Sequence, residues 1–278
     1  MGEGEVDGDF RELNEENRTI WDANAEWWDD RIGDGNAFQD ELIEPTQERL
    51  LAIRSEETVL DVGCGAGRFT RRLAELGAHV VAFDFSEKFI ARARKRTPKE
   101  MTNIEYHVID ATDEAQMLPL GRDRFDAAVA TVLLMDLADV APLMRALSEM
   151  LKVGGRFVFS LSHPCFHTAE SSKFTEVAEE DGRYVVKSGV KVTGYRTPVA
   201  YRTEGIIGQP EKQYCFHRPL SLLFRTAFES GFVIDGFEEP GLHPPAEDES
   251  PFHRPLSWRN MPEIPPILVV RMRLTKGV

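Results

Sequence analysis

The sequence predicts an α/β protein built on a doubly wound, mostly parallel sheet of seven strands. Short apolar strands alternate with helical stretches of about 10 to 15 residues, as a parallel sheet with helices on both faces requires. The first strand runs into a glycine-rich turn, and the next two strands each end in an aspartate. Because ligands of open α/β sheets bind beyond the carboxyl ends of the strands, these features mark a candidate binding crevice.

The first strand includes Asp61 and leads into a turn with glycines at 63, 65 and 67. Glycines at this spacing allow a sharp turn and an approach to a ligand that no Cβ would permit. A helix predicted over 68–76 then directs its amide-rich N-terminus into the same crevice. A dinucleotide-binding turn needs glycine or alanine at the sixth position from Gly63, where this chain has Arg68.

The run 59–69 resembles motif I of class I S-adenosylmethionine-dependent methyltransferases. The second strand, 79–84, ends in Asp84 at the position where a carboxylate normally holds a ribose diol. The resemblance implies that Asp110, at the end of the third strand, binds the adenine amino group and that the amide of Ala111 meets the adenine ring. The expected cofactor is S-adenosyl-L-methionine, and its expected binding residues are Asp61, Gly63, Cys64, Gly65, Asp84, Phe85, Asp110, Ala111, Thr131 and Trp28.

Two structural alternatives stay open for these carboxylates. Asp61 could cap the glycine turn, and Asp84 could cap the helix that begins after Phe85, because aspartate is favoured at such positions. Three acidic strand ends in the right order around one glycine turn nevertheless favour the methyltransferase fold.

The resemblance covers residues 45–160 closely and 217–275 in outline, and it implies a Rossmann-like sheet whose last strand is antiparallel beside the fifth. The later strands are expected at 125–131, 151–160, 232–237 and 267–274, with helices over 86–95, 142–151 and 219–230. The chain divides into a disordered acidic tail (1–16), a cap helix region (17–44), a cofactor-binding core (45–164), an insert that covers the acceptor (165–216) and the C-terminal part of the sheet (217–278).

Two segments flank the predicted crevice. Residues 17–28 form an amphipathic helix whose Trp21 and Trp28 either close the cofactor cleft or pack into the core, two interpretations of equal weight. Within the insert, 183–187 and 190–193 alternate like strands, and a turn at 188–189 would join them into a hairpin. Such an insert usually covers a pocket and selects the acceptor.

Composition limits the function classes. The chain of 278 residues carries 47 acidic and 33 basic residues, a net charge of −14 that repels extended polyanions. The basic run at 92–96 closes a predicted helix, where cations complement the helix dipole. With no apolar run of about 20 residues and no secretory signal, we expect a cytoplasmic protein. Its three cysteines predict no disulfide framework.

The acceptor side is predicted from histidines. His163 directly follows the fifth strand, so it is the first candidate for a catalytic base, and His217 is the second. Alternation of His163, Cys165 and His167 also allows a zinc site with Cys215 and His217, but Pro164 interrupts strand geometry, and we expect no metal.

We therefore expect methyl transfer to an oxygen, nitrogen or carbon atom of a small molecule, by a monomer or homodimer. An RNA-modifying methyltransferase would share the cofactor half but should carry an appended basic domain. A nucleoside-cofactor-binding protein without catalysis would keep the glycine turn and Asp84. A nicotinamide-dependent reductase is the weakest alternative, because of Arg68.

Overall fold

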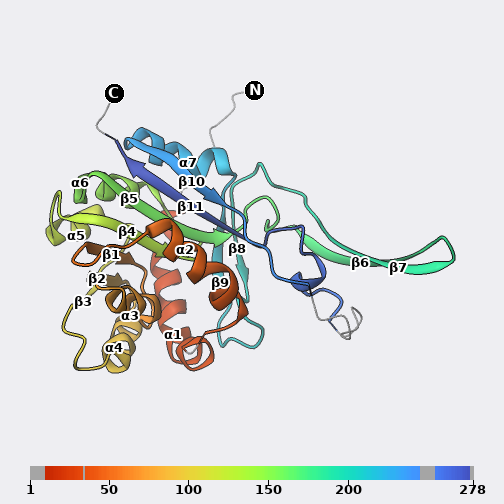
Figure 1. Cartoon of the computed structure of the whole chain (residues 1–278), viewed down its shortest axis with the longest axis horizontal. Helices are drawn as coiled ribbons and strands as arrows, with labels where there is room; N and C mark the ends of the chain where they lie inside the picture. The colour runs from red at the N-terminus through yellow and green to blue at the C-terminus, as the bar shows by residue number, and fades with distance from the viewer. Residues whose placement is uncertain (1–9, 34, 245–253, 276–278) are drawn as a thin grey trace.

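In the computed structural model, the described residues 10–33, 35–244 and 254–275 contain one seven-stranded sheet (Figure 1). Only β11 runs antiparallel to the rest, inserted between β5 and β10, which confirms the predicted fold. The strands expected at 79–84 and 125–131 match β2 and β4 residue for residue. The spatial order is β10 (Phe232–Glu238), β11 (Ile267–Leu274), β5 (Leu151–Ser162), β4 (Phe125–Thr131), β1 (Thr58–Val62), β2 (His79–Asp84) and β3 (Ile104–Val108).

Helices cover both faces because side chains alternate along each strand. In β1, Leu60 and Val62 join a core beneath α5, α6 and α7, whereas Val59 joins a second core beneath α2 and α3. The bounds are α2 (Glu44–Leu51), α3 (Arg68–Glu75), α4 (Glu87–Arg96), α5 (Glu114–Met117), α6 (Ala141–Met150) and α7 (Leu220–Glu229), with short turns η2 (Phe38–Ile43, π-helical), η3 (Leu118–Leu120) and η4 (Trp258–Asn260).

The N-terminal helix α1 (Asn14–Ile32) lies against α4. Its Asp29 is buried and ion-paired with Arg92 and Arg96 of the basic run, so this run attaches the cap helix besides closing α4. The predicted disordered tail needs correction. Residues 11–13 form the 3-10 turn η1 (Arg11–Leu13) and α1 begins at Asn14, while 1–9 lie outside the described residues.

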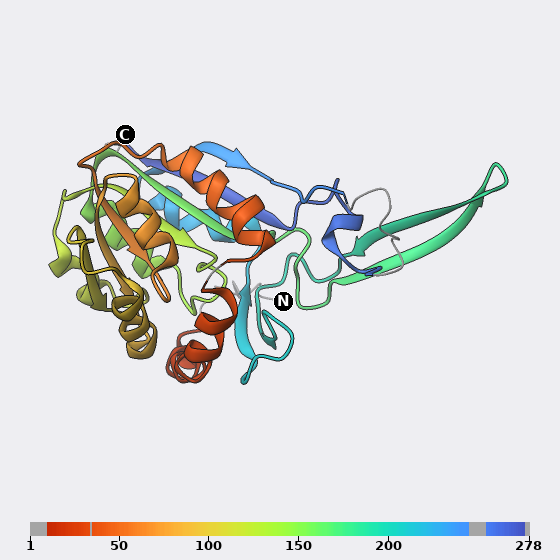
Figure 2. The ribbon, with the colours of Figure 1, turned by 60° about the horizontal axis from the view of Figure 1, so that its bottom comes forward.

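The insert contains two hairpins, β6 (Ser172–Glu180) with β7 (Arg183–Lys191) and β8 (Val199–Thr203) with β9 (Gln213–His217). The first projects away from the body (Figures 1 and 2). The prediction of a turn at 188–189 was wrong. Asp181 and Gly182 both have positive φ and form the two-residue turn, whereas Gly189 lies inside β7 against the ring of Phe174.

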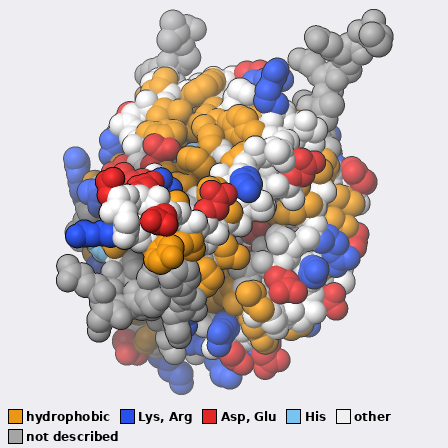
Figure 3. Space-filling view, turned by 90° about the vertical axis from the view of Figure 1, so that its right-hand side faces the viewer, with side chains coloured by type: hydrophobic (Ala, Val, Ile, Leu, Met, Phe, Trp, Pro, Cys, Tyr) orange, Lys and Arg blue, Asp and Glu red, His pale blue; other side chains and the backbone are white. Residues whose placement is uncertain are grey.

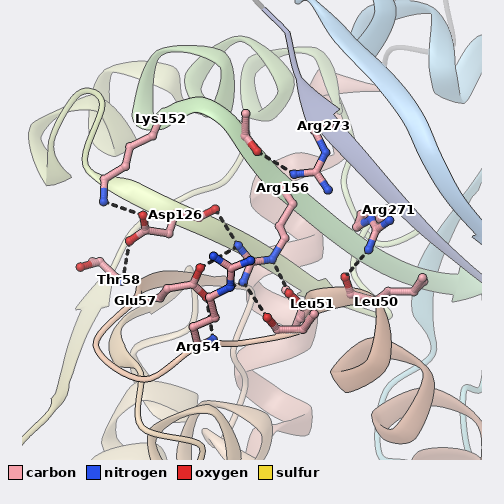
Figure 4. A network of polar contacts seen from close by, with 12 residues as sticks. Leu50, Leu51, Arg54, Glu57, Thr58, Asp126, Lys152, Arg156, Arg271 and Arg273 are labelled. Carbon is pink, nitrogen blue, oxygen red and sulfur yellow. Dashed lines mark hydrogen bonds and ion pairs between the residues drawn. The ribbon is translucent and has the colours of Figure 1, made fainter.

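The amino ends of the central strands are tied together by Arg156 of β5 (Figure 4). Its guanidinium donates to the carboxylate of Glu57, just before β1, and to the carbonyls of Leu51 and Asp126. Although burial alone would raise the pKa of Glu57, the hydrogen bonds from Arg156 lower it. This network leaves the opposite, carboxyl ends of the strands free to form a binding site.

No helix among the described residues is long and apolar enough to cross a membrane.

Candidate functional site

A cavity of about 670 Å³ lies at the carboxyl ends of β1, β2 and β4 and of the segment after β3. Its cover comes from α1 and η2, and a further wall comes from residues after β5 and before β11. This is the edge at which open α/β sheets bind ligands. All ten residues that the sequence nominated for the cofactor line this one cavity.

The glycine turn between β1 and α3 depends on three positive φ angles. Gly63, Gly65 and Gly67 have φ of 65°, 52° and 74°. A Cβ at Gly63 would lie 2.5 Å from the side chain of Leu133, and one at Gly67 would lie 2.5 Å from the hydroxyl of Tyr106. A Cβ at Gly65 would meet nothing nearer than Phe89 at 3.9 Å, so the backbone there borders open space. The turn therefore leaves room for a ligand at Gly65.

Asp84 connects the end of β2 to this turn. Its Oδ2 accepts a hydrogen bond from the amide of Gly65 at 2.9 Å, and its Oδ1 accepts one from the amide of Ser86 at 2.9 Å. Ser86, and not Asp84, is the N-cap of α4, since its hydroxyl accepts from the amide of Phe89. An ionised carboxylate has about four acceptor positions, so Asp84 keeps acceptor capacity for a ligand hydroxyl group beside these backbone amides.

Burial controls the protonation of the two carboxyl groups beside the turn. Desolvation raises the pKa of Asp61 to about 7, against the opposing hydrogen bond from the Thr70 hydroxyl at 2.5 Å. Desolvation likewise raises the pKa of Asp84 to about 6, although the amides of Ser86 and Gly65 favour the charged form. Both carboxyl groups can therefore exchange protons near neutral pH.

Asp110 is held by local and distant partners. Its Oδ1 accepts from the amide of Thr112 at 2.8 Å, and its Oδ2 accepts from the Asn14 side chain at 2.7 Å. The first residue of α1 therefore contacts the expected adenine position. Thr131, at the end of β4, donates to the side-chain oxygen of Gln47 at 3.2 Å.

The cap helix places two tryptophans on the cavity. Trp21 and Trp28 both line it, with ring centroids 5.5 Å apart, whereas Trp27 does not. The indole Nε1 of Trp28 is buried without a hydrogen-bond partner. Buried donors are nearly always paired, and an acceptor group inside the cavity would satisfy this one. Both rings therefore face the cavity, and neither belongs to the two apolar cores, while closure of the cleft by this helix stays a prediction.

The predicted catalytic histidines lie outside the cavity lining. His163 is buried, and its Nε2 contacts the carboxylate of Glu239 at 2.7 Å, while Nε2 of His217 contacts the carbonyl of Tyr195 at 2.8 Å. His167 lines the cavity instead. The chain turns after Pro164, with the amide of His167 bonded to the carbonyl of His163 at 2.9 Å, so the expected alternation does not persist.

His167 packs beside Trp258, with ring centroids 5.0 Å apart. Burial, with smaller contributions from Lys173 and His163, lowers the pKa of His167 to about 4. Its imidazole is therefore neutral at physiological pH, and its Nε2 is buried without a hydrogen-bond partner.

The loop after β4 supplies a further buried carboxyl group, from Asp136, which the sequence analysis missed. Its side chain lines the cavity and accepts from the Gln213 amide at 3.5 Å. Burial raises its pKa well above the ordinary value. Val132 in the same loop has a φ of 53°, a strained conformation for a β-branched residue. The rule that ligands bind after strand ends could have identified this loop.

The apolar wall was also missed, because it combines segments that are distant in the sequence. It is formed by Ile32, Phe38, Ile43, Ile206, Trp258, Pro266 and Ile267. Of the insert, His167, Gly205, Ile206 and Gln213 line the cavity, but the projecting β6–β7 hairpin does not. Within the described parts of the chain, no group of three or more His, Cys, Asp or Glu residues could hold a metal ion.

Comparisons with known proteins agree with this geometry. Residues 60–159 match a family model described as a methyltransferase domain. Ubiquinone biosynthesis O-methyltransferase of Hydrogenovibrio crunogenus is 31% identical over 157 residues, covering 55% of this chain and 60% of that protein. The same-named protein of Pseudomonas syringae pv. tomato is 31% identical over 143 residues, covering 50% of this chain and 60% of that protein. The chain thus spans about 60% of the length of these curated relatives.

Among solved structures, an S-adenosylmethionine dependent methyltransferase from Mesorhizobium loti is 29% identical with a TM-score of 0.62. The match covers 86% of this chain and 99% of that chain. Residues 60–159 thus carry a methyltransferase domain, and the chain is similar in sequence and fold to S-adenosylmethionine-dependent methyltransferases.

Proposed function

We propose that the protein transfers the methyl group of S-adenosylmethionine to an oxygen atom of a small, largely apolar acceptor. The observation that carries the proposal is one cavity of about 670 Å³ in which the polar strand ends meet an apolar wall. Small-molecule sites usually have volumes of roughly 300 to 1,000 Å³ and mostly apolar linings. The curated relatives are named O-methyltransferases, which favours oxygen as the nucleophile.

The residues around the glycine turn suit the cofactor. Open space beside Gly65 allows backbone contact, the remaining acceptor positions of Asp84 suit a ribose diol, and Trp28 offers an unpartnered donor. When bound, the cofactor supplies a sulfonium methyl group and its own leaving group, with the carbon–sulfur electron pair left on sulfur. The protein's task is then to align the acceptor and to exclude water. Trp21 and Trp28 of the cap helix serve the second purpose.

The acceptor half of the cavity combines apolar packing with one polar ring. Phe38, Ile43 and Trp258 present flat or branched apolar surface, and His167 presents a neutral imidazole. A base with a pKa near 4 is too weak to deprotonate an ordinary phenol, whose pKa is close to 10. His167 therefore orients the acceptor through a hydrogen bond. Proton transfer by His163 or His217 stays a prediction.

A small acceptor is favoured over RNA by charge. The chain has a net charge of −14, and on the face in Figure 3 the described Lys and Arg side chains are interspersed with Asp and Glu. A polyanion would need a continuous basic surface.

The cofactor half of the proposal is tested by calorimetric titration with S-adenosylhomocysteine. We expect binding by the wild-type protein, loss of binding by Asp84→Ala, and no binding of NAD. Binding of NAD in preference to S-adenosylhomocysteine would contradict the proposal.

The acceptor half is tested with methyl-labelled S-adenosylmethionine and three ring compounds of similar size, namely catechol, aniline and benzoate. Labelled ether or ester products support oxygen transfer. Labelled N-methylaniline alone would move the proposal to nitrogen, and labelled RNA from a parallel incubation would move it to the RNA-modifying class. His167→Phe keeps a flat ring without nitrogen atoms and should raise the KM for the acceptor more than it lowers kcat.

A further inference from the structure

The order of the strands predicts where the cofactor's sulfur lies. This step rests on the proposed function, which assigns the adenine to Asp110 after β3 and the ribose to Asp84 at the end of β2. The sheet order continues from β2 to β1 and β4. A ligand that extends along this edge from adenine through ribose next reaches the ends of β1 and β4, where the sulfur atom would lie. Asp136 belongs to the loop that follows β4, and it lines the cavity there.

The interior of the cavity is acidic. Four buried aspartates line it, namely Asp29, Asp61, Asp84 and Asp136, and of these Asp29 is ion-paired with Arg92 and Arg96 of α4. Arg68 is the one Lys or Arg among the described lining residues, and its guanidinium is paired with Glu44 and Asp40. Among the described lining residues, no unpaired Lys or Arg is therefore left to neutralise the carboxyl groups inside the cavity.

Asp136 is the carboxyl group with the weakest support from the protein. It is 9% exposed, and its side chain accepts one long hydrogen bond, from Gln213 at 3.5 Å. Asp84 and Asp61 by contrast accept hydrogen bonds at 2.9 Å and 2.5 Å. A weakly supported, buried carboxyl group gains most from a cation supplied by a ligand.

The groups that face Asp136 come from several elements. The charge of Asp84, at the end of β2, disfavours the ionisation of Asp136. The charge of Asp136 in turn helps to raise the pKa of Tyr201 in β8 and that of Cys215 in β9. Asn17 of α1 donates to the Asp136 carbonyl at 2.8 Å. The guanidinium of Arg218 is bound to the carbonyls of Leu137 and Ala138, at 3.0 and 2.6 Å.

We propose that Asp136 makes this cavity select the cationic S-adenosylmethionine over its neutral product, S-adenosylhomocysteine, with release of a proton when the cationic form binds. The two ligands differ by one methyl group and one positive charge on sulfur. A carboxylate beside the sulfonium stabilises the first ligand and gives nothing to the second. Methyl transfer thus removes the positive charge on sulfur that Asp136 stabilises. S-adenosylhomocysteine then dissociates more readily than S-adenosylmethionine.

The pH dependence follows from the protonation of the free site. Burial raises the pKa of Asp136 well above the ordinary value, so the free carboxyl group is largely protonated at low pH. A sulfonium ion favours the carboxylate and lowers that pKa in the complex, so a proton leaves on binding. The affinity for S-adenosylmethionine therefore rises with pH relative to that for S-adenosylhomocysteine. One unit of pKa change corresponds to about tenfold in this ratio.

The test is calorimetric titration of the full chain with both ligands at pH 6.5 and 8.0, in two buffers of different ionisation enthalpy. Asp136→Asn keeps the shape and removes the charge. We expect wild-type protein to release more protons with S-adenosylmethionine than with S-adenosylhomocysteine. In Asp136→Asn we expect the affinity ratio to fall about tenfold, with S-adenosylhomocysteine binding retained. Sinefungin, in which a protonated amine replaces the sulfonium, should follow S-adenosylmethionine.

Asp139→Asn is the matched control. Asp139 is buried nearby but is not among the residues that line the cavity, and its carboxylate accepts from the Ala141 amide and pairs with Arg11. Its substitution should leave the ratio unchanged. An unchanged ratio and proton release in Asp136→Asn, or an equal fall in Asp139→Asn, would overturn the inference. Failure of the wild-type protein to bind either ligand would instead overturn the proposed function.

Discussion

Removal of the Asp29 carboxylate should loosen the cap helix. Asp29 has a side chain that is 2% exposed, and it is ion-paired with Arg92 and Arg96 of α4, whose side chains are 22% and 30% exposed. Breaking a fully buried ion pair costs about 3 to 5 kcal/mol. Both arginines can recover some hydration, and Arg92 keeps Asp30 as a partner, so we expect about 2 to 3 kcal/mol for Asp29→Ala.

The loss should act on α1 first, because Asp29 lies in the last turn of this helix and joins it to α4. Asn24 exchanges hydrogen bonds with the backbone of Glu211, and Asp22 accepts from the Ser86 hydroxyl. A cost of 2 to 3 kcal/mol raises the opening equilibrium of α1 by roughly 30-fold to 150-fold. Hydrogen exchange of amides in 14–32, with β4 and β5 as internal reference, measures this factor directly.

Asp30→Ala is the control for the cap helix. Asp30 is one residue away and also pairs with Arg92, but its side chain is 63% exposed, and exposed ion pairs contribute about 0 to 1 kcal/mol. Its effect on exchange should stay within about fivefold. Equal exchange in Asp29→Ala and wild-type protein would show that the buried ion pairs do not hold α1, and would refute the reasoning.

Three further predictions concern binding, stability and pH. Asp84→Ala should weaken S-adenosylhomocysteine binding at least about 100-fold by calorimetry, because two charge-assisted hydrogen bonds and the Gly65 contact are lost together; a change below tenfold would contradict the ribose assignment. Arg156→Met should cost about 3 kcal/mol in urea unfolding, because the Glu57 carboxylate, 16% exposed, loses its partner; adding Glu57→Gln should recover part of this, and purely additive losses would contradict the coupling. Ligand-free wild-type protein should lose more stability between pH 5 and 8 than Asp61→Asn. The folded-state pKa of Asp61, about 7, exceeds the unfolded value, so its contribution to stability is present below about pH 4 and is lost as pH rises through 7. Free energies of urea unfolding that change equally with pH in the two proteins would exclude this.

The sheet could be predicted well because its signals are local. The strands β2 and β4 coincide with the predicted ranges, and α3 begins at Arg68, directly after the glycine turn. Period-two apolar patterns, glycines and acidic strand ends act between near neighbours in the chain. The turn of the first hairpin was predicted at 188–189 and lies at 181–182. Ser188–Gly189 and Asp181–Gly182 are both turn signals in the sequence, and only the pairing of β6 with β7 distinguishes them.

The sequence by itself determined the fold class and the strand-end part of the cavity, because the ten nominated residues lie on consecutive strand ends and on the cap helix. Tertiary structure alone decided the apolar part of the cavity. Phe38, Ile206 and Trp258 meet there from separate parts of the chain, and a turn after Pro164 brings His167 to the cavity where His163 was expected. Contacts between distant segments depend on how helices and loops pack around the sheet, which no local pattern specifies. The burial that raises the pKa of Asp136 arises only from that packing.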